Sequence, residues 1–65
     1  MTQISQKELM YLEEALSMEA KEVEKFSSAA SQAQDPQVKM LLNNISNMHQ
    51  NHFNTFKQYL DNNCQ

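Results

Sequence analysis

An acidic residue interrupts an otherwise apolar heptad seam in the first half of the chain. The seam advances in alternating steps of three and four residues through Leu9, Leu12, Leu16, Glu19, Val23, Phe26, Ala30 and Ala33. This spacing is typical of a helix that packs along other helices. A carboxylate in such a seam costs free energy to bury unless it is hydrogen-bonded, ion-paired or bound to a metal ion. Glu19 therefore needs a partner from another part of the fold.

The second half of the chain supplies two histidines at a matching height. His49 and His52 are three residues apart, so they face the same side of a helix. The predicted corner is Asp35-Pro36, because Asp is a strong N-cap and Pro suits the first position of a helix. Sixteen residues separate Glu19 from Asp35, and sixteen more reach residue 51. We therefore expect Glu19 to lie beside both histidines.

Two helices account for nearly the whole chain. Ser5 and Glu8 match the capping box that starts a helix, and the apolar periodicity that follows predicts a helix over about 6–33. A second helix is predicted over about 36–61, and it carries two neighbouring apolar stripes. One stripe contains Val38, Leu41, Ile45, Met48, His52 and Phe56, and the other contains Leu42, Ile45, His49, His52, Phe56 and Tyr59. Together they make a face that is wider than one partner helix can cover.

The 65 residues are long enough for a single helical-hairpin domain, 1–65. A chain of this length buries little surface alone, so small folds usually need a disulfide, a metal ion or a partner. Cys64 is the only cysteine, which excludes a disulfide framework and zinc-finger spacing, and its own role stays open. The predicted fold class is therefore all-α, an antiparallel two-helix hairpin that dimerises into a four-helix bundle.

Composition excludes several functional classes. The net charge is −3 with five lysines and no arginine, which disfavours nucleic-acid binding. No apolar run approaches the roughly 18 residues that span a membrane, and the first five residues lack the features of a secretion signal. We therefore expect synthesis in the cytoplasm. A two-helix chain offers no rigid oxyanion hole for a Ser-His-Asp hydrolase and no element that forms a cleft, so no catalytic residue is assigned and an enzyme is disfavoured.

Three interpretations are open for the cluster of Glu19, His49 and His52. In the first, the three residues bind a metal ion, since carboxylate and imidazole ligands suit iron, zinc, manganese or copper. Alternatively they form a metal-free polar layer, in which Glu19 bonds a histidine and fixes the helix register. In the third interpretation they lie on the surface. Glu22, one turn further on, would add a second carboxylate, and a homodimer would bring two Glu19 and four histidines around its axis.

These residues resemble a pattern of the ferritin-like superfamily, especially its rubrerythrin branch. In that family one helix carries an iron-ligating Glu with a Tyr seven residues later, and the next helix carries Glu-x-x-His. Here Phe26 follows Glu19 by seven residues, His52 falls on the family's His, and His49 replaces its Glu. The resemblance spans about residues 9–60 and implies half of a ferritin-like four-helix bundle, with iron or another transition metal as cofactor. The replacement by His49 removes a bridging anion, which argues against ferroxidase or peroxidase chemistry.

Two segments are similar to a narrower group, the small spore coat F-like proteins of endospore-forming bacteria. They are DPQVKMLL at 35–42 and MHQNHF at 48–53. This resemblance implies a non-catalytic structural or assembly protein of the spore coat, whose partners are a second copy and other spore coat proteins. Two alternatives stay open. One is a metal-binding or redox half-ferritin that uses Glu19, His49 and His52, and the other is a helical adaptor that docks on a larger partner.

Overall fold

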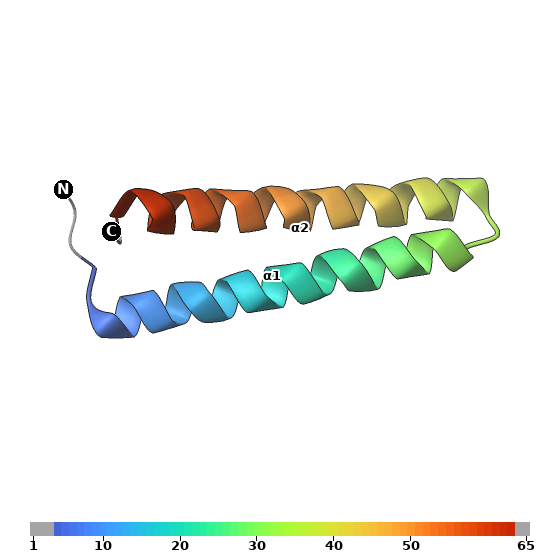
Figure 1. The fold of residues 1–65 in the computed structure, drawn as a ribbon. Helices are drawn as coiled ribbons and strands as arrows, with labels where there is room; N and C mark the ends of the chain where they lie inside the picture. Colours follow the sequence, from blue (N-terminus) through green and yellow to red (C-terminus); the bar gives the residue numbers. More distant parts are fainter. Residues whose placement is uncertain (1–3, 64–65) are drawn as a thin grey trace.

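The chain folds into two long antiparallel helices (Figure 1), and a computed structural model describes its residues 4–63. α1 spans Gln6–Gln32 and α2 spans Pro36–Asn63. The predicted hairpin is confirmed, and no strand occurs within residues 4–63. Neither of these helices is long and apolar enough to cross a membrane, as the sequence led us to expect. Pairing with a second copy stays a prediction, and Cys64 lies outside the described residues.

Side-chain caps fix the start of both helices. Ser5 Oγ accepts a hydrogen bond from the Glu8 amide at 3.0 Å, and the Glu8 carboxylate accepts one from the Ser5 amide at 2.9 Å. This pair completes the predicted capping box. Asp35 Oδ1 accepts hydrogen bonds from the amides of Gln37 and Val38 at 2.8 and 3.1 Å. Both caps occupy amides that have no partner inside a helix, so the local sequence determines where α1 and α2 begin.

The helix ends agree less closely with the sequence prediction. α1 ends at Gln32, one residue before the predicted boundary, whereas α2 continues to Asn63, two residues beyond it. The side-chain amide of Asn63 donates to the backbone carbonyl of Tyr59 at 2.7 Å. The apolar pattern of the sequence stops at Leu60. It therefore did not predict the last turn of α2, which a polar side chain stabilises.

The entire predicted seam of α1 packs toward α2. Every seam residue from Leu9 to Ala33 is partly or fully buried, and Ala30 is the most enclosed. The residues of α2 that pack against this seam also follow steps of three and four; they are Leu42, Ser46, His49, Phe53, Phe56 and Leu60. As predicted, one partner helix does not cover the whole apolar face of α2, because most residues of the stripe that begins at Val38 remain exposed.

Small residues bring the two helices together between the corner and the middle of the hairpin. Ser46 is buried, and its hydroxyl donates a hydrogen bond to the backbone carbonyl of Val23 at 3.0 Å. Ala30 is the buried residue of α1. Toward the open end, where α1 begins and α2 ends, the seam contains leucine and phenylalanine instead, and the helices diverge (Figure 1). The gradient in side-chain size therefore gives the hairpin a tapered shape.

Candidate metal centre

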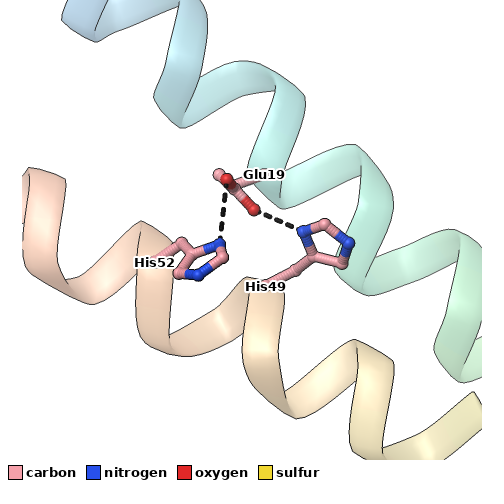
Figure 2. Close-up of side chains that lie close together, drawn as sticks. All are labelled: Glu19, His49 and His52. Carbon is pink, nitrogen blue, oxygen red and sulfur yellow. Dashed lines mark hydrogen bonds and ion pairs between the residues drawn. The ribbon is translucent and has the colours of Figure 1, made fainter.

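Glu19 meets both histidines near the middle of the hairpin (Figure 2). The carboxylate comes from the seam of α1, and the two imidazoles come from adjacent turns of α2. Nδ1 of His49 lies 2.5 Å from Oε1 of Glu19, and Nδ1 of His52 lies 3.3 Å from Oε2. The height match predicted by counting residues from the corner is confirmed.

The cluster is closed on one side and open on the other. The side chains of Glu19 and His49 are only 18% and 19% exposed, whereas that of His52 is 48% exposed. Surface placement of the whole cluster is therefore the wrong interpretation. The polar layer and the metal site are the two interpretations that this burial leaves, and His52 is the side from which solvent or an ion reaches the cluster.

The hydrogen bond to Glu19 determines where each imidazole carries its proton. An ionised carboxylate only accepts hydrogen bonds, so Nδ1 of His49 must be the donor, in the neutral ring as well as in the charged one. The same assignment follows for the longer contact of His52. In a neutral ring of this kind the lone pair is on Nε2, which takes no part in either contact with Glu19.

Aromatic packing fixes the orientation of His49. The ring of Phe26 is stacked on it, with centroids 5.8 Å apart and planes 9° apart, and His52 meets it edge-on at 5.9 Å. The sequence prediction put Phe26 in the seam but missed this contact. Side chains on a helix lean toward its N-terminus, so in antiparallel helices Phe26 leans away from the corner while His49 leans toward it. This difference in direction is the feature from which the contact between the two rings could have been predicted.

The two histidines keep Glu19 ionised. The hydrogen bond from His49 is the largest cause of a lowered pKa for the Glu19 carboxyl group. Partial burial opposes this effect, while the positive charge of each ring and the longer contact with His52 add to the lowering. The pairing therefore supplies what a carboxylate in an apolar seam requires.

The three side chains are also close enough to surround one metal ion. One ligand atom from each lies within 4.8 Å of the others, and within residues 4–63 no second group of this kind occurs. Two imidazoles and one carboxylate are a known ligand set for Fe(II) and other first-row ions. Coordination through Nδ1 would displace the protons that Glu19 accepts. Coordination through Nε2 would instead leave Glu19 to orient both rings from behind.

Glu22 does not belong to this cluster. It follows Glu19 by three residues and is partly buried, but it is not among the side chains close enough to share an ion. The second carboxylate that we considered from the sequence is therefore not supplied within one hairpin. Residue spacing alone shows which residues share one side of a helix, but it does not show whether a residue lies in the seam or beside it.

We expect the hairpin to lose stability at acid pH, because Glu19 becomes protonated there. A lowered pKa means that the folded state favours the ionised carboxylate more than the unfolded state does. The resulting stabilisation is fully present above the ordinary glutamate pKa of about 4.3 and is lost as the pH falls through the lower folded-state pKa. Thermal unfolding followed by circular dichroism below about pH 5 measures this loss.

Two variants isolate the contribution of Glu19 to this pH dependence. Glu19→Gln should lack the acid-induced loss of stability that the carboxylate causes, because its amide does not titrate. Glu14→Gln removes an exposed carboxylate from the opposite side of α1, so it should retain that loss. Equal pH dependence in all three proteins would contradict the role assigned to Glu19.

Comparison of the chain with protein-family models, with curated proteins and with solved structures gives no match. The resemblance to the ferritin-like and spore coat F-like proteins therefore rests on the sequence motifs alone. The structure establishes an all-α hairpin in which Glu19 contacts His49 and His52.

Proposed function

We propose that this protein is a non-catalytic structural protein whose hairpin is a unit of assembly. A mainly apolar stripe along α2, exposed over most of its length and here called the outer stripe, carries the proposal. It consists of Val38, Leu41, Ile45, Met48, His52, Thr55 and Tyr59, in steps of three and four residues. Residues at this spacing pack on a neighbouring helix, and α1 already occupies the other apolar side of α2. The outer stripe is therefore suited to a further helical surface.

The shallow core of one hairpin supports the same proposal. Among residues 4–63 only Ala30 and Ser46 are classed as buried, and no large side chain in that range is fully enclosed. Small folds of this kind usually gain stability from an additional contribution, and association is the one that an apolar stripe provides. Within such an assembly the pairing of Glu19 with the histidines keeps the two helices in register.

We expect Met48→Glu to disrupt the assembly. Sedimentation equilibrium of the natural chain should give at least twice the chain mass of 7.6 kDa. A glutamate in the middle of the outer stripe should raise the Kd for association at least about tenfold, because an unpaired charge is costly to bury. Asn43→Glu adds the same charge at an exposed position on the side of α2 away from the outer stripe and should associate normally. A monomeric natural chain would contradict the proposal and favour an adaptor that docks on a larger partner.

The resemblance of two sequence segments to spore coat F-like proteins supports the spore coat as the location of this assembly. We expect quantitative mass spectrometry of a sporulating culture of the source organism to find the chain in the coat fraction of purified spores. Vegetative cells harvested before sporulation serve as the control. Expression confined to growing cells, with none of the chain in the coat fraction, would contradict this location.

The cluster in Figure 2 favours a second candidate function, binding of iron or another first-row transition metal. The observation that supports it is specific, since three ligand side chains from two helices converge and His52 leaves the cluster open to solvent. A bound metal ion would also compensate the negative charge of Glu19, so the carboxylate would no longer require a hydrogen bond from an imidazole. Metal binding is compatible with assembly, because the cluster shares only His52 with the outer stripe.

Metal content of protein purified without a tag separates this candidate from a metal-free polar layer. If the candidate is right, incubation with Fe(II) or Zn(II) should give stoichiometric metal, measured by plasma mass spectrometry after desalting. His52→Ala should lose the metal, whereas Asn51→Ala, a change of an exposed neighbour, should retain it. Substoichiometric metal in the natural chain would rule the candidate out.

A further inference from the structure

The outer stripe continues across α1 to form one face of the hairpin, here called the outer face. The equivalent heptad positions of α1 contain Tyr11, Ala15, Met18, Glu22 and Lys25. Tyr11 and Glu8 of α1 line the same pocket as Thr55 and Tyr59 of α2, which shows that the two stripes lie on one side of the molecule.

The outer face is the principal unpartnered surface of the described chain and has the size of a protein interface. It holds six of the eight large exposed hydrophobic side chains, namely Tyr11, Met18, Val38, Leu41, Met48 and Tyr59. The Cα trace measures 47 by 16 Å in its two longer directions. Stable interfaces bury about 800 Å² on each partner, and a face that runs the length of the hairpin offers an area of that order.

The outer face has a hollow at one end and a protrusion at the other. The hollow is an apolar pocket of about 510 Å³ at the open end, between Tyr11 and Leu12 of α1 and Phe56 and Tyr59 of α2. Leu41 is exposed toward the corner. Both features are about equally far from the middle of the hairpin. Leu41 precedes His49 by eight residues, Phe56 and Tyr59 follow it by seven and ten, and Tyr11 precedes Glu19 by eight.

We propose that a second copy of this chain covers the outer face in an antiparallel, two-fold arrangement, with Leu41 of each copy in the pocket of the other. The inference rests on the proposed function, since it specifies the surface and register of that assembly. A two-fold axis across the middle of the hairpin exchanges its two ends, so each protrusion meets a hollow. A parallel pair would place one pocket on the other and leave Leu41 without a recess.

A matched pair of truncations tests the surface. Leu41 and Met40 are adjacent and equally exposed, at 58%, but only Leu41 belongs to the outer face. Leu41→Ala should raise the Kd for association at least about tenfold, whereas Met40→Ala should leave it unchanged. Helicity at high protein concentration verifies that both variants fold. Equal Kd values for the two variants would overturn the assignment of this face.

Thiol cross-linking between differently substituted chains tests the register. All proteins carry Cys64→Ser, and a Leu41→Cys chain is refolded with either a Tyr59→Cys chain or an Ala29→Cys chain before oxidation. A disulfide forms only when the two Cα atoms come within about 7 Å. The antiparallel pair should cross-link positions 41 and 59 between copies, identified by mass. Predominant cross-linking of 41 with 29 would indicate a parallel pair and overturn this inference while self-association stands, whereas a monomeric natural chain would overturn both.

Discussion

The contact between Glu19 and His49 is the constraint on which the rest of the hairpin depends. An apolar seam by itself tolerates slippage, because leucine, phenylalanine and alanine can exchange places at moderate cost. A shift of α2 by one heptad would put Leu42 or Phe56 opposite the carboxylate in place of His49. Glu19 would then be partly buried without an acceptable partner, at a cost that the apolar contacts do not offset. The short corner between α1 and α2 limits the height at which the two helices meet, and this polar contact favours the same height.

Local signals made much of this fold predictable from the sequence. The capping box, the Asp-Pro corner and the seam of α1 are all short-range patterns, and counting residues from the corner was enough to place Glu19 beside His49. The side of α2 that faces α1 was not predictable in the same way. Two apolar stripes lie next to each other on this helix, and periodicity does not rank them. The structure uses Ser46, whose small size and bond to the Val23 carbonyl have no counterpart in an apolar pattern.

The candidate site was predictable as a set of residues but not as a set of bonds. Spacing brought Glu19 and both histidines to one height, yet it did not show that each Nδ1 atom points at the carboxylate or that Phe26 covers one imidazole. It also did not show that Glu22 lies beside the cluster and outside it. These details depend on how side chains lean along antiparallel helices and on the flank that each residue occupies. Neither property can be read from residue spacing alone.

The taper of the hairpin sets where the molecule opens first. Near the corner buried Ala30 brings the helices into close contact, and nearer the middle the Ser46 hydroxyl bonds α2 to α1, whereas larger side chains at the far end line an open apolar pocket. Local opening takes place where few contacts must break, so fluctuations of a single copy concentrate at the open end, where α1 begins and α2 ends, and fade toward the proline corner. A newly made hairpin would thus form its contacts first at the corner and then progressively toward the open end. The contacts of Glu19 with the histidines would form halfway along, and only with the helices in register.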